Sequence, residues 1–229
     1  MIPKIAHFHW EGEPINWLRM MGIYTFARLN PRWDVRLMRT PAHIRRVGLP
    51  HYCQEADWAW AEALCEFGGF SWGTDTVFVR PVPDEWCEAD MCACTNGGKS
   101  FFHGAVGSVP GTDFLKSYVE SCRSLPTHDL DYQSYGTVMM NKIASDMGGV
   151  DMVHNGLSFV DMPVDAMTPV RWHDPARVWK EEPLNLPDDT IGVHWYGGAP
   201  CSRSREWDVP AKHGNAAIVK LAIEVTGGL

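Results

Sequence analysis

Residues 57–81 constrain the fold more than any other stretch of this 229-residue chain. Their first half is rich in alanine, leucine and glutamate, which favour helix. The pair Gly68-Gly69 then supplies residues that tolerate the left-handed conformation at a helix end. We therefore expect a helix that stops at these glycines.

A strand, an acidic turn and a second strand are expected to follow. The segments Phe70-Ser71-Trp72 and Val77-Phe78-Val79 are typical of buried strands. The turn Gly73-Thr74-Asp75 lies between them and would hold one carboxylate at a strand end, where α/β sheets collect ligands. This position suits a cation and a phosphate.

The N-terminal region predicts a βαβ unit. The segment 4–10 alternates as a strand, 15–29 is predicted as a helix that Asn30-Pro31 ends, and 33–38 is predicted as the next strand. Such units build parallel sheets. The expected fold class is therefore α/β, with a mixed, largely parallel sheet flanked by helices.

Three later segments extend this pattern. Residues 101–108 are predicted as a buried strand, and 190–198 as a strand that runs into a glycine turn. Residues 112–124 are predicted as an amphipathic helix with Thr112 as its N-cap. Its apolar side would be formed by Phe114, Leu115, Tyr118 and Val119.

Length and composition predict one domain over residues 1–229, because a hydrophobic content of 45% is sufficient for one sizeable core. No apolar run is long enough to span a bilayer, and the N-terminus enters strand-like sequence without a signal peptide. Seven cysteines, an odd number without a regular framework, fit reduced thiols. We expect a cytoplasmic protein that does not insert into membranes.

The net charge of −8 argues against a general attraction to nucleic acid. Two local clusters of arginines are present. A solvated surface is the favoured interpretation of the first cluster, and the second, Arg203 with Arg205, lies beside a candidate site. The first cluster consists of Arg36, Arg39, Arg45 and Arg46.

Two pairs of potential metal ligands have a simpler interpretation. Cys92 and Cys94 would face the same side of a strand, but no second cysteine pair accompanies them, so buried neutral cysteines are favoured. His7 and His9 also share a strand face. We prefer buried, hydrogen-bonded histidines to a metal pair there.

Several short motifs follow one another in an order typical of a known family. They are Ile2-Pro3-Lys4, His7, Trp10, Gly12, Asn30-Pro31, Trp33, Ala56-Asp57, Leu64, 68–72 and Thr74-Asp75. In this order they resemble the DxD sugar transferases of glycosyltransferase family 32, which include capsular-polysaccharide transferases and initiating mannosyltransferases. The chain departs from the family pattern at two positions, where Trp60 replaces an arginine and Gly73 replaces the first Asp of the DxD motif.

The resemblance implies a GT-A-like (Rossmann-like) fold and a divalent cation, Mn²⁺ or Mg²⁺. Asp75 and His194 are the metal ligands that it implies, with two diphosphate oxygens and water completing the coordination sphere. Asp57 and Asp75 are the catalytic residues that it implies, with Asp57 orienting sugar hydroxyls. Residues 1–110 would bind the nucleotide sugar, and residues 111–229 would supply the acceptor side and the C-terminal metal-binding strand and loop.

The donor expected from the resemblance is a UDP- or GDP-sugar. Trp10 is expected to stack on the nucleobase, because a flat indole can do so at little entropic cost. Arg203 or Arg205 would neutralise the leaving diphosphate as a loop closes. The expected donor-binding residues are Trp10, Asp57, Trp60, Gly73, Thr74, His103, Arg203 and Arg205.

The predicted activity is metal-assisted transfer of a sugar to a hydroxyl group, such as that of a glycan, with retention of anomeric configuration. Two alternatives stay open. One is a phage-type DNA-modifying transferase acting on hydroxymethylated bases, which the small size permits and the acidic balance opposes. The other is a catalytically weak module that binds nucleotide sugars without turnover.

Overall fold

The computed structural model describes residues 1–12, 14–95, 97–125, 130–149 and 156–228, apart from the side chains of 102–104. These residues belong to two compact units, which we call the large-sheet unit and the small-sheet unit. Each unit draws on residues from both sides of position 110, and the single-domain organisation stays a prediction. The large-sheet unit comprises Met1–Glu11, Asp34–Trp72 and Pro83–Met162, and the small-sheet unit comprises Gly12–Trp33, Gly73–Val82 and Pro163–Leu229.

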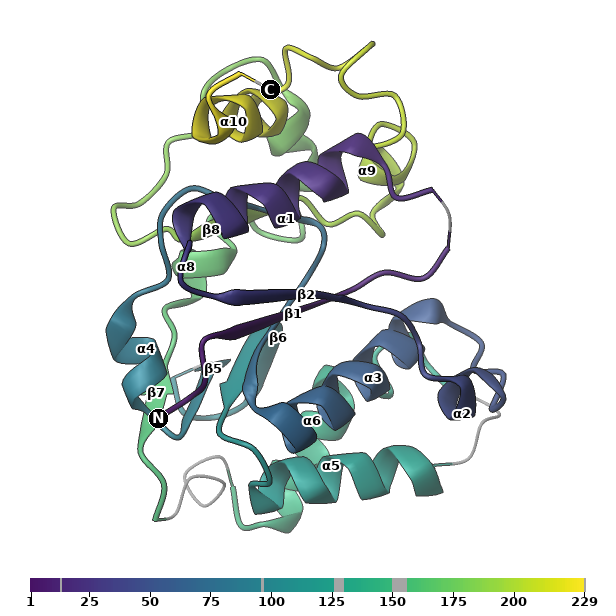
Figure 1. The fold of residues 1–229 in the computed structure, drawn as a ribbon. Helices are drawn as coiled ribbons and strands as arrows, with labels where there is room; N and C mark the ends of the chain where they lie inside the picture. The colour runs from purple at the N-terminus through teal and green to yellow at the C-terminus, as the bar shows by residue number, and fades with distance from the viewer. Residues whose placement is uncertain (13, 96, 126–129, 150–155, 229) are drawn as a thin grey trace. The chain divides into compact units, whose positions relative to one another are not determined.

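The large-sheet unit is built on a six-stranded sheet (Figure 1). The pairs β2/β1, β1/β3 and β5/β7 are parallel, whereas β3/β6 and β6/β5 are antiparallel. The predicted α/β fold with a mixed, largely parallel sheet is thus confirmed. In spatial order the strands are β2 (Asp34–Met38), β1 (Ile5–His9), β3 (Gly69–Trp72), β6 (Phe101–Ser108), β5 (Met91–Thr95) and β7 (Phe159–Asp161).

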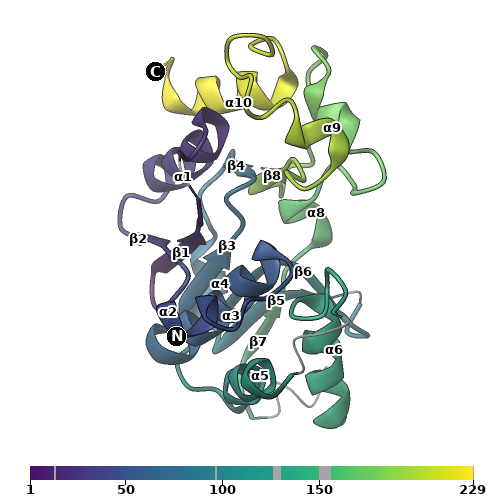
Figure 2. The same cartoon turned by 90° about the vertical axis from the view of Figure 1, so that its right-hand side faces the viewer.

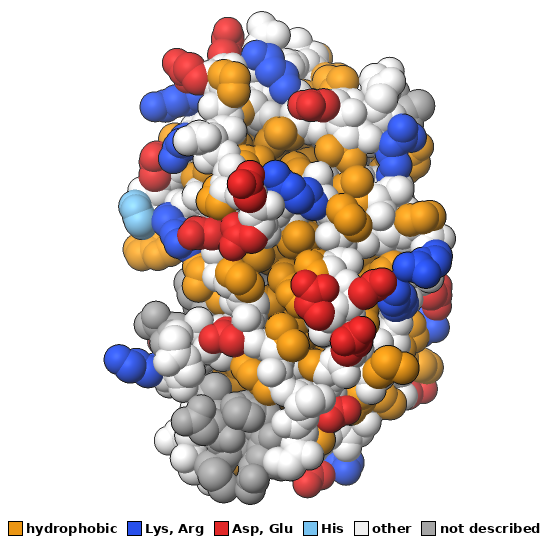
Figure 3. All heavy atoms as spheres, turned by 90° about the vertical axis from the view of Figure 1, so that its left-hand side faces the viewer, with side chains coloured by type: hydrophobic (Ala, Val, Ile, Leu, Met, Phe, Trp, Pro, Cys, Tyr) orange, Lys and Arg blue, Asp and Glu red, His pale blue; other side chains and the backbone are white. Residues whose placement is uncertain are grey.

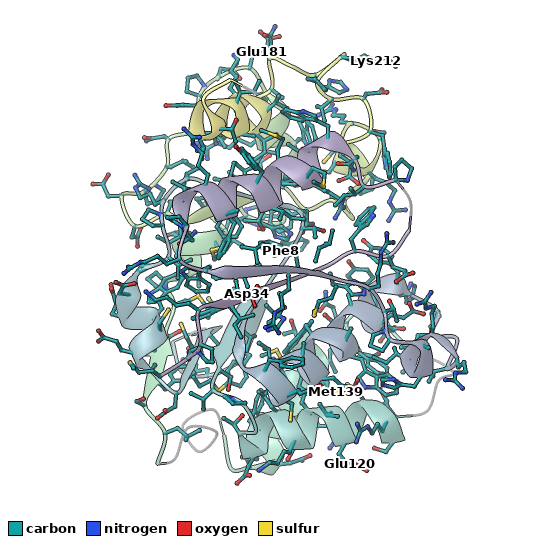
Figure 4. The ribbon with its side chains drawn as sticks, in the orientation of Figure 1. Phe8, Asp34, Glu120, Met139, Glu181 and Lys212 are labelled. Atoms are coloured by element: carbon teal, nitrogen blue, oxygen red, sulfur yellow. The ribbon has the colours of Figure 1, made fainter. Side chains whose placement is uncertain are left out.

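Helices cover this sheet with one continuous apolar core. Trp58 and Leu64 from α3 pack with Tyr118 from α5 and Met140 from α6. At about 1.5–3 kcal/mol for each fully buried large side chain, this cluster is a main source of stability. Met139 points into the unit and Glu120 points away from it (Figure 4). The helices are α2 (Ala42–Arg45), α3 (Tyr52–Phe67), α4 (Asp84–Glu88), α5 (Asp113–Ser124) and α6 (Thr137–Asp146).

The central helix ends where the glycine pair predicts. The backbone of Gly68 has φ 65°, a left-handed value that suits glycine, and its N–H donates to the Leu64 carbonyl. The chain then enters β3 directly at Gly69.

The small-sheet unit pairs two short strands under helix α1 (Trp17–Leu29). Strands β4 (Thr76–Phe78) and β8 (Gly192–His194) are antiparallel neighbours (Figure 2). The β8 strand is shorter than the predicted segment 190–198. Leu18, Met21, Val77, Val193 and Trp195 belong to the core of this unit. Its remaining helices are α8 (Val164–Met167), η1 (Pro175–Trp179), α9 (Pro200–Arg203) and α10 (Ala217–Thr226).

Charges of both signs are interspersed on the face shown in Figure 3. Exposed ion pairs of the chain include Lys142 with Asp146 and Lys212 with Asp208. Over the described ranges, none of the helices has the length and apolarity needed to cross a membrane.

The N-cap of α5 offers a test of the local structure. Thr112 is 7% exposed, and its Oγ1 accepts a hydrogen bond from the Leu115 N–H at 3.3 Å. We expect Thr112→Ala to lower the free energy of unfolding by about 1 kcal/mol, whereas Thr112→Ser retains the acceptor and most of the stability. Urea denaturation of both variants measures the difference, and equal losses would contradict the capping role.

Candidate functional site

Asp75 and His194 lie together in the small-sheet unit. Asp75 directly precedes β4 and His194 ends β8, and the antiparallel register places Thr76 opposite His194. As a result, His194 Nε2 lies 2.9 Å from Asp75 Oδ2. The Gly197 backbone N–H donates to the same oxygen at 2.8 Å, and the Trp195 backbone N–H donates to the backbone carbonyl of Asp75 at 3.0 Å.

The surroundings of Asp75 keep its carboxylate ionised. Burial alone would raise its pKa, but His194, the Arg19 guanidinium and the Gly197 N–H favour the charged form and hold the pKa well below its usual range. An ionised carboxylate beside an imidazole is a donor set that accepts divalent cations.

The separation of the two side chains fits neighbouring positions around one cation. Ligands at about 2.0–2.2 Å from an octahedral ion lie roughly 3 Å apart when adjacent. The 2.9 Å between His194 Nε2 and Asp75 Oδ2 is the length of a hydrogen-bonded ion pair and is also compatible with this value. Within the part of the chain that the structure describes, no group of three or more His, Cys, Asp or Glu residues is arranged to hold a metal.

Gly73 lies against the carboxylate. A Cβ atom at this position would lie 2.8 Å from Asp75 Oδ1, and the backbone of Gly73 is outside the left-handed region. The glycine therefore leaves the space that the Asp75 side chain occupies.

A buried arginine that the sequence analysis missed lies next to this turn. Arg19 on α1 is 5% exposed, and its Nη1 donates to Thr74 Oγ1 at 2.8 Å. Its Nη2 lies 3.1 Å from Glu206 Oε2, and burial raises the pKa of Glu206. A single arginine inside an otherwise apolar helical turn was the sequence signal that could have indicated this buried residue.

Arg203, by contrast, is exposed and contacts the Gly198 carbonyl, and Arg205 is partly exposed.

Tyr196 makes the turn that follows β8. Its backbone has φ 53°, a conformation that costs on the order of 1–2 kcal/mol for a residue of this type. Its ring centroid lies 4.3 Å from that of His194, and its hydroxyl donates to the Val170 carbonyl at 2.8 Å. Burial raises the pKa of Tyr196 to about 12, so the hydroxyl stays protonated.

In the large-sheet unit, Trp10 follows β1 directly, and its backbone N–H donates to the Met38 carbonyl at 3.0 Å. The preceding His9 places Nε2 3.0 Å from Thr40 Oγ1, which donates to Glu55 Oε2. Since the hydroxyl proton goes to Glu55, His9 donates through Nε2. Thr40 is buried and connects the end of β1 with α3, which holds the segment of Trp10 in place.

Asp57 and Trp60 contact each other on α3, where Trp60 Nε1 donates to Asp57 Oδ1 at 3.2 Å. Trp60 is 4% exposed and packs against Tyr118 with ring centroids 5.2 Å apart. A Cβ atom on Gly136 would lie 3.0 Å from Asp57 Oδ2, so the carboxylate lies against the start of α6. Because Trp60 is buried and bonded to Asp57, it would influence donor binding through the position of the Asp57 carboxylate.

The other predicted residues can be placed more briefly. His103 lies on β6, and its side chain is outside the described residues. Cys92, Cys94 and His7 are buried, with His7 Nε2 2.8 Å from the Gly68 carbonyl, as the simpler interpretation predicted. The expectation that Trp10, Asp57, Asp75 and His194 share one site stays a prediction, because the first two belong to the large-sheet unit and the others to the small-sheet unit.

Comparison with known proteins gives a structural likeness. No family model and no curated protein matches the sequence. Among the solved structures with a similar fold is the PaToxG glycosyltransferase, with a TM-score of 0.50 and 10% sequence identity. The match covers 68% of this chain and 74% of that chain. It supports a GT-A-like fold.

The partly buried His9 predicts a dependence of stability on pH. Desolvation lowers its pKa from 6.5 to about 4, so the unfolded chain binds the proton more readily between these values. The contribution of His9 is complete above pH 6.5 and is lost as the pH falls towards 4, amounting to about 3 kcal/mol at most. Denaturation of His9→Gln should show a flatter pH profile than wild type, and His173→Gln, at an exposed position, is the control.

Gly73 provides a charge test of the acidic turn. Gly73→Asp places a second carboxylate beside Asp75 Oδ1, whereas Gly73→Asn has nearly the same shape without the charge. Without divalent cations, we expect the Asp variant to be less stable than the Asn variant by on the order of 1 kcal/mol, because like charges repel.

Adding Mn²⁺ should close or reverse this difference, because the cation neutralises both carboxylates. Melting temperatures of the two variants, with and without Mn²⁺, measure the effect. A difference that Mn²⁺ leaves unchanged would argue against a cation site in this turn.

Proposed function

We propose that the chain is a glycosyltransferase that moves a sugar from a nucleotide-sugar donor to a hydroxyl group of an acceptor. The GT-A-like fold supports this proposal, since the PaToxG glycosyltransferase has a similar fold. The observation that carries it is the Asp75–His194 pair, 2.9 Å apart where β4 begins and its neighbour β8 ends.

The chemistry requires stabilisation of a leaving group. Departure of a nucleoside diphosphate leaves an oxocarbenium-like sugar and concentrates negative charge on the diphosphate. Asp75 and His194 would hold Mn²⁺ or Mg²⁺, which when bound neutralises that charge as a Lewis acid.

Neighbouring residues fix the orientation of Asp75 and His194 and the charge of Asp75. The Gly197 N–H fixes Asp75 Oδ2, and the low pKa of Asp75 maintains its charge. The Tyr196 ring packs beside the His194 imidazole and limits its rotation. Two ligands held in this way lose little freedom when a cation binds, because their orientation is fixed beforehand.

The finer assignments belong to the same proposal. Trp10 would stack on the nucleobase of a UDP- or GDP-sugar, and Asp57 would accept hydrogen bonds from sugar hydroxyls. Thr74 and Gly73 would shape the turn beside the diphosphate. Transfer with retention is proposed, and the anomer of the product, observed by NMR, reports it directly.

A thermal-shift panel of nucleotide sugars, with and without Mn²⁺, tests the proposal. Stabilisation should need both a donor and the cation, and donor hydrolysis should accompany it. Binding without turnover would favour the nucleotide-sugar-binding module. Sugar on hydroxymethylated DNA, detected by mass spectrometry after co-expression with a base-hydroxylating enzyme, would favour the DNA-modifying transferase.

Asp75→Asn is the most informative variant. It keeps the shape of the side chain and removes the charge that a cation needs, so we expect at least a hundredfold loss of metal-dependent turnover. Because the ionised Asp75 is stabilised by His194 and the Gly197 N–H, the melting temperature should also fall, so turnover is compared at a temperature at which the variant is folded. Asp208→Asn removes an exposed carboxylate of the same unit and is the matched control. Unchanged Mn²⁺-dependent turnover in Asp75→Asn would refute the ligand role.

A further inference from the structure

One buried ion pair contacts the residues next to both proposed metal ligands. The side chains of Arg19 and Glu206 are 6% and 5% exposed, and their closest charged atoms are 3.1 Å apart. Arg19 Nη1 donates at 2.8 Å to Thr74, which directly precedes the carboxylate ligand. Glu206 Oε2 accepts at 3.2 Å from Nε1 of Trp195, which directly follows the histidine ligand.

The same pair also packs against the backbone that fixes Asp75. A Cβ atom on Gly197 would lie 2.2 Å from Arg19 Nη2 and 3.0 Å from Glu206 Oε2. The ion pair therefore fills the space beside Gly197, whose N–H donates to Asp75 Oδ2 at 2.8 Å. Three separate contacts thus connect this pair to the segments that carry Asp75 and His194.

A buried ion pair of this kind adds little net stability on average, because desolvation offsets the attraction between the charges. Removing one partner is costly, since the other is left buried and unpaired. The directional contacts of Arg19 and Glu206 are better explained by the geometry that they impose, because a planar guanidinium and a carboxylate each fix two partners at once.

We infer that Arg19 and Glu206 are positioning residues for the Asp75–His194 pair. This inference rests on the proposed function. The ion pair holds the Thr74 hydroxyl, the Trp195 indole and the backbone of Gly197, and through these residues it sets the separation between the two ligands.

The test replaces both charges together. The variant Arg19→Met with Glu206→Met keeps much of the buried volume and leaves no charge unpaired. Glu206→Gln, which preserves shape and removes one charge, is the second variant. Asp208→Asn breaks the exposed pair with Lys212 and is the control. Each protein is assayed for Mn²⁺ affinity in the presence of UDP or GDP, for hydrogen exchange of the Gly197 amide without metal, and for unfolding by urea.

We expect the double variant to remain folded, with Gly197 exchanging at least tenfold faster and Mn²⁺ binding at least tenfold weaker, while the control matches wild type. A folded double variant with wild-type exchange and affinity would overturn the inference. If the double variant does not fold, Glu206→Gln decides by the same two criteria. If wild type does not bind Mn²⁺ even with UDP or GDP present, the proposed function fails, and the Gly197 exchange still tests the positioning role.

Discussion

The candidate site depends on the antiparallel pairing of β4 with β8. Only three residue pairs make up the register, yet they determine that His194 faces Thr76. Gly197 and Asp75, which this pairing brings into contact, are 122 positions apart in the chain. Val77 and Val193 are fully buried in the same core. All three residues of β4 are buried, so the register is fixed by close packing: a slip of one residue would put side chains of different size in each packed position and move His194 away from Asp75.

Much of the fold could be predicted because its signals are local. Helix α5 has the predicted cap at Thr112 and buries the predicted apolar side, and α3 stops at Gly68. Caps, glycine stops and hydrophobic periodicity all act within a few residues of one another. The segment 190–198 is a strand that runs into a glycine turn, as predicted, but β8 covers only Gly192–His194, and Tyr196 before the turn adopts a left-handed backbone conformation that no propensity indicates.

The site was less accessible to such reasoning, because its contacts span the chain. Arg19 and Glu206 lie 187 positions apart, and neither position predicts the other. Arg203 and Arg205 were predicted to act at the site because they are close to His194 in the sequence. The buried arginine beside the acidic turn is instead Arg19. The pairing of Asp75 with His194 was inferred from a family resemblance and not from their spacing. Their roles in binding and catalysis stay predictions.

The charges around the acidic turn indicate how a cation and a donor would bind. Arg19 and Glu206 balance each other, so Asp75 supplies the negative charge of residues 73–75, and Gly73 adds none. Affinity for divalent cations rises with the number of carboxylate ligands. A turn with one carboxylate is therefore a weak site alone, and diphosphate oxygens would have to supply the missing charge. A cation and a nucleotide sugar are accordingly expected to bind together, each raising the affinity for the other, because coupling between two ligands is reciprocal.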